Sequence, residues 1–268
     1  MRYQIDHDYH IHSRLSLCSC DDGQTPEAIL EIAKRKGLKK ICLTNHFWDE
    51  RIPYNTIANK WYEEQNFAHI SQSLPLPNDP DITFLFGCEA DMGNDDVIGL
   101  SKERCDEFGF IIVSITHFHL VGGEKWGERS NADLARRWVE RFDALLNSDL
   151  PFHKVGAGHL ASGLINKNSR EGYLDTLNLI PQREIERLFT KAAQLGLGIE
   201  LNSNDMNYRD EEADTVLRIF RTAKACGCKF YLGSDSHERD SFDGVDKIFE
   251  RCIDALLLTE SDKFEISS

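Results

Sequence analysis

Two kinds of hydrophobic pattern alternate along the chain. Short apolar runs rich in β-branched residues recur between longer segments in which apolar residues return every three or four positions. Each short run has a length typical of a strand buried in a parallel sheet. The runs cover residues 3–10, 40–44, 83–89, 110–116, 154–159, 198–201 and 229–233.

The longer segments carry the signals of helices. Thr25 is a candidate N-cap, and Pro26 suits the first position of the helix that follows. Gly37 is placed to end that helix. Helical spacing recurs within 131–147, 185–192, 216–220 and 245–256. Seven strand-then-helix units in succession predict an α/β fold with a parallel sheet.

Residues 49–82 interrupt this alternation. The segment contains four of the seven prolines, and we interpret it as an irregular insertion after the second strand. Its residues Trp61, Tyr62 and Phe67 could cover a cleft, although packing against the body of the protein is the simpler interpretation. No proline-rich or low-complexity linker divides the sequence, so we expect residues 1–268 to form a single domain.

Composition narrows the functional classes. Among 268 residues, 31 Lys and Arg stand against 45 Asp and Glu, which gives a formal net charge of -14 at pH 7. Nucleic-acid binding needs a basic surface, so no nucleic-acid partner is expected. No run of 18 apolar residues is present in the sequence, so no membrane span is expected either. The polar start of the chain does not resemble a secretory signal, and we expect a cytoplasmic protein whose eight cysteines are mostly reduced.

Candidate metal ligands stand at or just past the ends of six predicted strands. Five of these ends carry a histidine, and the sixth carries a glutamate. The residues are His10, His12, His46, Glu89, His117, His159, Asp235 and His237. The carboxyl ends of parallel strands form the active face of α/β folds. Residues from six strands can meet at one point only if the sheet curls, so the sequence predicts a barrel rather than an open sheet.

Spacing within the strands adds a second argument. Residues two apart in a strand point to the same side, so His10 and His12 can bind one ion together, as can Asp235 and His237. Imidazole suits zinc, manganese or iron, and Glu89 can bridge two ions. A single histidine of this kind is more often structural, but five such strand ends are hard to explain in that way. We therefore expect two to three divalent metal ions.

The ordered set of motifs resembles one known family. Residues 8–13 (DYHIHS) and 37–46 (GLKKICLTNH) look like the opening of PHP (polymerase and histidinol phosphatase) domains. Residues 114–117 (SITH), 158–160 (GHL) and 232–237 (LGSDSH) are similar in order and spacing. The resemblance covers nearly the whole chain. It implies a distorted seven-stranded (β/α)7 barrel, up to three metal ions and phosphoester hydrolysis, with histidinol-phosphate phosphatases as members of similar size.

Carried over residue by residue, the resemblance implies the same eight residues as metal ligands. His117 is preferred to His119, because the family's ligand directly follows the S-x-x strand end. The family has aspartate at the position of Asn45. That aspartate supports a neighbouring ligand, so the amide of Asn45 is expected to weaken the hydrogen bond.

The family also has a ninth ligand, His or Asp, between the H-x-H pair and the first helix. Counting forward from the pair places this ligand at Cys18, whereas counting back from the end of the helix places it at Asp21. We expect Asp21, because the helix is a rigid reference and a hard carboxylate suits a hydrolytic site. The alternatives are Cys18, Cys20 and Asp22.

The resemblance also implies roles in the reaction. Divalent ions lower the pKa of bound water, so that hydroxide held near Glu89 could attack phosphorus. A further ion near His46 and His159 would stabilise the charge on a phosphate oxygen. Asp235 or His237 is expected to give a proton to the leaving alkoxide.

We expect, accordingly, a metal-dependent phosphatase for a small phosphomonoester, with L-histidinol phosphate as the specific hypothesis. Arg209 and Lys167 are candidates for binding the substrate phosphate, although each could equally be a surface charge. One alternative is a phosphodiesterase or nucleotide hydrolase that uses the same site. Another is a regulatory metal-binding domain with weak or no catalysis, for which the change at Asn45 is the one hint.

Overall fold

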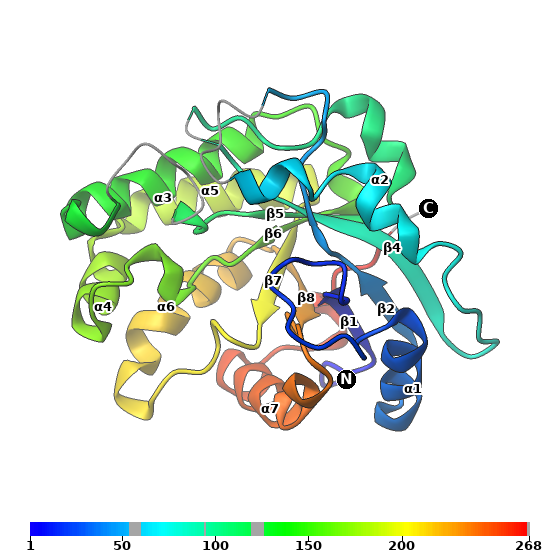
Figure 1. Ribbon diagram of the computed structural model, residues 1–268. Helices are drawn as coiled ribbons and strands as arrows, with labels where there is room; N and C mark the ends of the chain where they lie inside the picture. Colours follow the sequence, from blue (N-terminus) through cyan, green and yellow to red (C-terminus); the bar gives the residue numbers. More distant parts are fainter. Residues whose placement is uncertain (54–59, 94, 119–125, 267–268) are drawn as a thin grey trace.

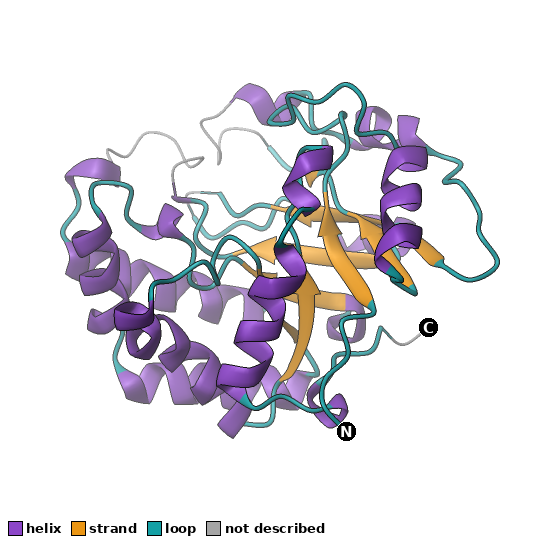
Figure 2. Cartoon of the chain, turned by 90° about the horizontal axis from the view of Figure 1, so that it is seen from below, coloured by secondary structure: helices purple, strands orange, loops and turns teal. Residues whose placement is uncertain are grey.

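The protein is described by a computed structural model that covers residues 1–53, 60–93, 95–118 and 126–266. Seven parallel strands follow one another around a curled sheet, and helices surround it (Figures 1 and 2). They are β1 (His7–Ile11), β2 (Lys40–Leu43), β4 (Thr83–Ala90), β5 (Phe110–Ser114), β6 (Val155–Gly158), β7 (Gly198–Asn202) and β8 (Lys229–Gly233). The seven predicted runs coincide with these strands apart from shifts at their ends, the largest at residues 3–6, which precede β1.

The first and last strands of the sheet meet at their carboxyl ends. The backbone N–H of Asp235 donates to the carbonyl of His10 at 2.7 Å, and that of His12 donates to the carbonyl of Ser236 at 3.0 Å. These bonds bring β1 and β8 together and produce a nearly closed, seven-stranded barrel. The predicted α/β barrel is therefore confirmed.

An eighth, two-residue strand extends β2. Strand β3 (His46–Phe47) pairs with β4 through His46 and Glu89, in the same register that joins Lys40 of β2 to Thr83. Strands β2 and β3 are thus one strand that is interrupted at residues 44–45. The interruption leaves the side chain of Asn45 available to the loop that follows β1.

Aromatic side chains fill the inside of the barrel. Tyr9 on β1 and Phe110 on β5 lie on strands that are not neighbours, yet their ring centroids are 5.4 Å apart. Phe110 also contacts Tyr231 on β8 at 5.0 Å, and Phe264 near the C-terminus packs against both. The interior is therefore a packed core, and a ligand can enter only at the mouth of the barrel.

Helices cover the outside of the sheet in Figure 2. They are α1 (Pro26–Lys36), α3 (Asn131–Leu146), α4 (Arg170–Leu179), α5 (Gln182–Leu195), α6 (Ala213–Ala225) and α7 (Val245–Leu256). Helix α1 begins as predicted, since the Thr25 hydroxyl accepts a hydrogen bond from the backbone of Ala28, and it ends at Gly37 with φ 71°. Helix α4 was not predicted; its buried side chains are Tyr173, Thr176 and Leu177.

Short 3-10 helices connect the larger elements. They are η2 (Lys60–Glu63), η3 (Ser71–Ser73), η4 (Lys102–Glu107), η6 (Trp126–Glu128), η7 (Phe152–Lys154), η8 (Gly163–Ile165), η9 (Asp210–Glu212), η10 (Arg239–Phe242) and η11 (Glu260–Asp262). Two of them, with the short helix α2 (Phe67–Ile70), lie in the predicted insertion. The insertion therefore has local helical structure in its described part.

The insertion both packs on the barrel and reaches its mouth. Tyr62 is buried, and Phe67 packs on Phe86 and Phe108. Trp61, by contrast, lines the cavity at the mouth of the barrel. Tyr62 and Phe67 thus pack against the body of the protein, whereas Trp61 lies at a cleft.

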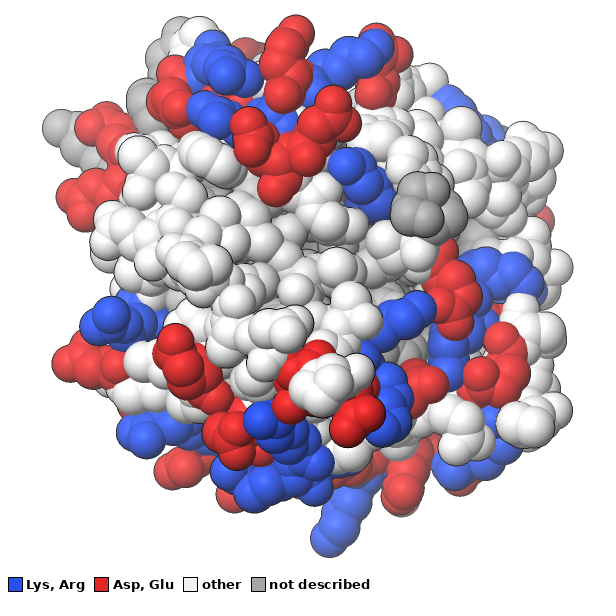
Figure 3. Space-filling model, turned by 90° about the vertical axis from the view of Figure 1, so that its right-hand side faces the viewer, with Lys and Arg blue, Asp and Glu red and all other residues white. Residues whose placement is uncertain are grey.

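Charged residues of both signs are interspersed on the surface. On the face shown in Figure 3 they gather around a broad area of uncharged side chains. No helix among the described residues is long and apolar enough to cross a membrane.

Candidate metal centre

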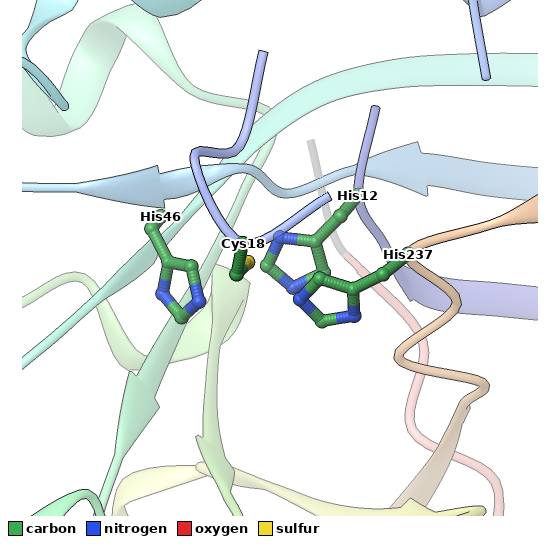
Figure 4. A group of neighbouring side chains, drawn as sticks. All are labelled: His12, Cys18, His46 and His237. Atoms are coloured by element: carbon green, nitrogen blue, oxygen red, sulfur yellow. The ribbon is translucent and has the colours of Figure 1, made fainter. Parts of the chain in front are cut away.

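The carboxyl ends of the strands bring the eight expected ligands together at the mouth of the barrel. Their nitrogen and oxygen atoms form overlapping groups in which all ligand atoms lie within 4.8 Å of one another. Three of the groups are His10–Glu89–His159, His10–His12–Asp235 and His46–Asp91–His117. A fourth joins His12, His46 and His237 to Cys18 (Figure 4). The overlap places several potential cation sites side by side.

Glu89 lies at the centre of these groups. Its Oε2 atom is 2.9 Å from His46 Nδ1, 3.3 Å from His12 Nε2 and 3.5 Å from His10 Nε2. Its Oε1 atom is 3.3 Å from His159 Nε2 and accepts a hydrogen bond from the Ser114 hydroxyl. One carboxylate therefore faces four histidines from three strand ends.

Buried partners fix which nitrogen of each ring faces the centre. His10 Nδ1 donates to Glu200 Oε1 at 2.5 Å, so in the neutral ring that a metal ion requires, Nε2 is the free atom. His117 donates in the same way from Nδ1 to Asp91 Oδ1 at 2.7 Å. An imidazole held by a carboxylate at one nitrogen is oriented to bind a metal with the other.

Glu200 has room only because two neighbouring residues are glycines. Its second oxygen, Oε2, accepts a hydrogen bond from the backbone N–H of His159 at 2.9 Å. A Cβ atom at Gly158 would lie 3.0 Å from Glu200 Oε2, and one at Gly233 would overlap the carboxylate and lie 2.7 Å from His10 Cβ. The ends of β6 and β8 are thus shaped around this buried carboxylate.

Two of the candidate ligands have a left-handed backbone. His159 has φ 53° and directly follows β6, and Asp235 has φ 55° and lies two residues past the end of β8. This conformation costs an L-residue about 1–2 kcal/mol. Such strain persists where the surrounding structure demands it, and it is common at functional sites.

The carboxylates of the site are held in the charged form. Burial raises the pKa of Glu89, but the neighbouring His46 and His10 lower it by more, so that the pKa lies well below its ordinary value. Burial likewise raises the pKa of Asp235, but His10 and His159 lower it by more, so that this pKa also lies well below its ordinary value. The site therefore offers buried negative charge to a cation.

Several buried polar atoms of the site have no hydrogen-bond partner within the described protein. They include Glu89 Oε2, His46 Nδ1 and His159 Nδ1. Glu89 Oε2 and His46 Nδ1 are close, but they are not aligned as a hydrogen bond. Leaving such atoms unpaired in the interior is unfavourable, whereas binding a divalent ion satisfies imidazole nitrogen and carboxylate oxygen together. The residues present fit a metal centre.

The structure does not bring Asp21, the residue expected as ninth ligand, together with the other candidate ligands. Asp21 makes a two-pronged ion pair with Arg239, at 2.8 and 2.9 Å, and belongs to none of the potential metal groups. Cys18 occupies the place beside the histidines instead. Cys20 and Asp22 are exposed and outside the groups, and His119 lies outside the described residues. The count forward from the H-x-H pair thus leads to the residue that lies beside the histidines, whereas the count back from the helix leads to a residue paired with Arg239.

Asn45 is fully engaged, but not with the ring of His46. Its Oδ1 atom accepts hydrogen bonds from the Ser13 backbone at 2.8 Å and from the Ser16 hydroxyl at 3.0 Å. The Ser16 oxygen in turn accepts from His12 Nδ1 at 2.7 Å. Asn45 therefore supports His12 through a serine, and its amide oxygen accepts both hydrogen bonds of this arrangement.

A cavity of about 550 Å³ opens above the metal groups. Its described walls are Cys18, His46, Trp61, His117, His159, Ser162, Gly163, Leu164, Asn204, Asp235 and His237. Its size suits a small organic ligand. Trp61 and Leu164 are apolar residues of its lining, and Ser162 and Asn204 add neutral polar groups.

The structure places neither expected phosphate-binding residue in this cavity. Arg209 is exposed and precedes η9, and its Nε atom lies 4.0 Å from Glu212. Lys167 is exposed on an adjoining hollow that shares Gly163 and Leu164 with the cavity. Lys and Arg do not occur among the described cavity residues, so a substrate phosphate there would depend on bound cations for its positive partners.

Three carboxylates of the site were not assigned to it from the sequence: Asp91, Glu200 and Asp205. Asp91 follows Glu89 by two positions, and the spacing rule applied to His10 and His12 could have found it. Asp205 lies 3.6 Å from His159 Nδ1 and accepts a hydrogen bond from the backbone of Ala161. It comes from the loop after β7, and no spacing rule connects it to β6.

The chain is similar to known proteins in sequence and in fold. The model of the PHP domain family matches residues 8–204. The chain belongs to the PHP family. A curated relative from Shewanella oneidensis, named "Probable phosphatase", is 23% identical over 251 residues, which cover 92% of this chain and 81% of that protein.

Solved structures share the PHP fold. Histidinol phosphate phosphatase from Lactococcus lactis, in complex with zinc, L-histidinol and phosphate, aligns with a TM-score of 0.61 at 16% identity over 97% of this chain and 98% of its own. A candidate histidinol phosphatase from Listeria monocytogenes aligns with a TM-score of 0.58 at 14% identity over 90% and 99%. At these identities the likeness concerns the fold.

Proposed function

We propose that this PHP protein is a metal-dependent phosphatase that hydrolyses a small phosphomonoester, with L-histidinol phosphate as the specific candidate substrate. The observation that carries the proposal is the convergence of overlapping histidine and carboxylate groups on the floor of the cavity of about 550 Å³. The ligands we propose are the eight strand-end residues expected from the sequence. The matching family and the phosphatase relative support the same reaction class.

Two to three divalent ions, zinc, manganese or iron, would supply a Lewis acid and a water of lowered pKa. Glu89 fixes the positions of the surrounding histidines relative to one another. Asp235 and His237 both line the cavity, and their side chains are 10% and 26% exposed, so we propose that one of them passes a proton, taken up from water, to a leaving oxygen there.

The walls of the cavity support a small organic phosphate. Trp61 and Leu164 offer an apolar surface to the organic part of the substrate. Asn204 donates to Asp235 Oδ2 at 3.2 Å and also faces the cavity, so it can fix the orientation of that carboxylate beside the substrate. An imidazole-bearing alcohol such as L-histidinol matches this combination of an apolar wall and neutral polar groups.

The direct test is phosphate release by the purified protein loaded with zinc, manganese or iron. L-histidinol phosphate and p-nitrophenyl phosphate should be hydrolysed, and bis-p-nitrophenyl phosphate much more slowly. The double change His10→Ala and His12→Ala should abolish turnover and metal content, whereas His153→Ala, an exposed histidine outside the site, should change neither. Turnover by metal-stripped protein would overturn the proposal, and preference for the diester would favour a phosphodiesterase.

A further inference from the structure

Cys18 lies among three histidines at the mouth of the barrel. A thiol sulfur and one nitrogen each of His12, His46 and His237 all lie within 4.8 Å of one another. In Figure 4 the Cys18 side chain stands between the rings of His46 and His12, and the ring of His237 lies against that of His12. The ring centroids of His12 and His237 are 4.0 Å apart, and the ring planes are nearly parallel, with an angle of 16° between them. These four side chains come from three separate parts of the chain.

The loop that carries Cys18 is anchored on both sides of the cysteine. Before it, the Ser16 hydroxyl donates to Asn45 Oδ1 at 3.0 Å. After it, the Ser19 hydroxyl donates to the backbone carbonyl of His237 at 2.6 Å. The position of Cys18 beside the histidines is therefore built by the loop and is not the chance placement of an exposed side chain.

The three histidines are prepared to accept a cation. His12 donates from Nδ1 to the Ser16 oxygen, and His237 donates from Nδ1 to the carbonyl of Asp235 at 2.8 Å. Each ring therefore keeps Nε2 unprotonated. His46 is 6% exposed, and its buried Nδ1 atom has no hydrogen-bond partner. This nitrogen lies 2.9 Å from Glu89 Oε2 without a hydrogen bond to it, and a cation bound to both atoms would satisfy them.

We propose that Cys18 binds a metal ion as a thiolate, together with His12, His46 and His237, and that it makes this position selective for Zn²⁺ over Mn²⁺. The inference rests on the proposed metal centre but not on the phosphatase reaction. Thiolate is a soft ligand that zinc accepts readily, whereas manganese favours carboxylate and water oxygens. The groups that contain Glu89, Asp91 and Asp235 are richer in oxygen and remain open to harder ions.

The first test measures metal affinity. Cys18→Ser should lower zinc affinity of one site by more than tenfold, since even outer partners of a ligand contribute about 10–100-fold. It should change manganese affinity little. Cys20→Ser, at an exposed cysteine two positions further on, is the matched control and should leave both affinities unchanged. Equal zinc affinity in Cys18→Ser and the parent protein would overturn the proposal.

The second test is spectroscopic and does not depend on a variant's affinity. Protein loaded with Co²⁺ should show a thiolate-to-cobalt charge-transfer band in the near ultraviolet, which Cys18→Ser loses and Cys20→Ser keeps. In the parent protein, Zn²⁺ should protect Cys18, but not Cys20, from alkylation by iodoacetamide, as followed by peptide mass spectrometry. No charge-transfer band and equal alkylation of Cys18 with and without zinc would overturn the assignment.

A third pair of variants separates the two counts of the ninth position. Cys18→Asp replaces the soft ligand with a hard one and should shift the ratio of zinc to manganese affinity toward manganese. Asp21→Asn should leave metal binding unchanged, because Asp21 is engaged by Arg239. Loss of a metal ion in Asp21→Asn but not in Cys18→Ser would assign the ninth ligand to Asp21. Because these readouts are metal content and spectra, they stand even if no phosphomonoester is hydrolysed.

Discussion

His10 and Glu200 lie 190 residues apart in sequence, and their side chains meet at 2.5 Å between Nδ1 and Oε1, with both side chains fully buried. The hydrogen bond at Nδ1 turns the other ring nitrogen, Nε2, toward Glu89 and Asp235. Burial lowers the pKa of His10, but Glu200 and the other carboxylates around it raise the pKa more, so that it lies well above the ordinary value. Glu200 is therefore a positioning residue.

Glu200→Ala should weaken metal binding by about 10–100-fold, because His10 loses the partner that orients it. Glu200→Gln keeps an oxygen that can accept from Nδ1 and should lose less. The measurement is zinc affinity by competition with a chelating dye. Glu250→Gln, on the exposed face of α7, is the matched control. Unchanged affinity in Glu200→Ala would show that the pair does not position the ligand.

Gly233→Ala should also lower zinc affinity, although it replaces neither His10 nor Glu200. The added methyl group would lie 2.7 Å from His10 Cβ and overlap the Glu200 carboxylate, so one of the two must move. We expect lower zinc affinity and reduced turnover. Gly163→Ala introduces the same group where no atom lies within 4 Å and should leave zinc affinity unchanged. Equal behaviour of the two variants would contradict the prediction.

Metal removal should lower stability as well as activity. Chelation leaves the charges of Glu89 and Asp235 without a cation, and added zinc should restore the free energy of unfolding. A single site at 100 times its dissociation constant contributes about 2.7 kcal/mol. Urea unfolding with and without zinc measures the difference, and the His10→Ala, His12→Ala double variant should show much less of it. The prediction fails if zinc stabilises that variant as strongly as the parent.

Trp61 should affect substrate affinity rather than chemistry. Its ring lines the cavity and meets His46 edge-on, with centroids 5.0 Å apart. An aromatic contact contributes about 0.5–1.5 kcal/mol, so Trp61→Ala should raise KM for an aryl phosphate about 2- to 10-fold. In Trp61→Ala, KM for glycerol phosphate should change less than KM for the aryl phosphate. In Trp61→Phe, the ratio of the two KM values should stay close to that of the parent protein. An unchanged ratio of the two KM values would show that the ring does not face the substrate, and metal content is the control for the nearby ligand.

His7 predicts a dependence of stability on pH. It is 1% exposed and accepts a hydrogen bond at Nε2 from the backbone of Leu232, and burial lowers its pKa below the ordinary 6.5 despite the opposing effect of Asp6. The unfolded chain binds a proton that the folded chain excludes, so His7 makes stability fall as the pH drops below 6.5. The slope contributed is at most about 1.4 kcal/mol per pH unit. Urea unfolding between pH 7.5 and 5.5 should show a steeper decline for the parent than for His7→Asn, and parallel curves would contradict the prediction.

The strands and the barrel could be predicted because local pattern and chemistry agree. Short apolar runs set the strands, and the histidines at their ends require the sheet to close. Helix α4 escaped prediction because its ten residues bury little apolar surface, and β3 escaped because a two-residue strand has no pattern of its own. Such elements are set by tertiary contacts rather than by local sequence.

The site could be predicted wherever ligands lie on strands, and it was less predictable where they lie on loops. Strand geometry fixes the direction of His10 or Glu89, so their sequence positions suffice. The loop after β1 has no such periodicity, and only its hydrogen bonds to Asn45 and His237 show that Cys18, not Asp21, reaches the histidines. The partners of the ligands, such as Glu200, depend on which strands become neighbours.

The insertion after β3 carries Trp61 to the cavity and, four residues later, presents Gln65 to the loop of Cys18. Gln65 Nε2 donates to the carbonyl of Leu15 at 3.1 Å, and His69 Nε2 donates to the same oxygen at 2.7 Å. One segment therefore braces the loop that holds the sulfur and also forms a wall of the substrate cavity. If the proposed metal and substrate sites are correct, sequence changes that remodel this segment to admit a different phosphoester should alter metal preference at the same time, so that the two specificities change together.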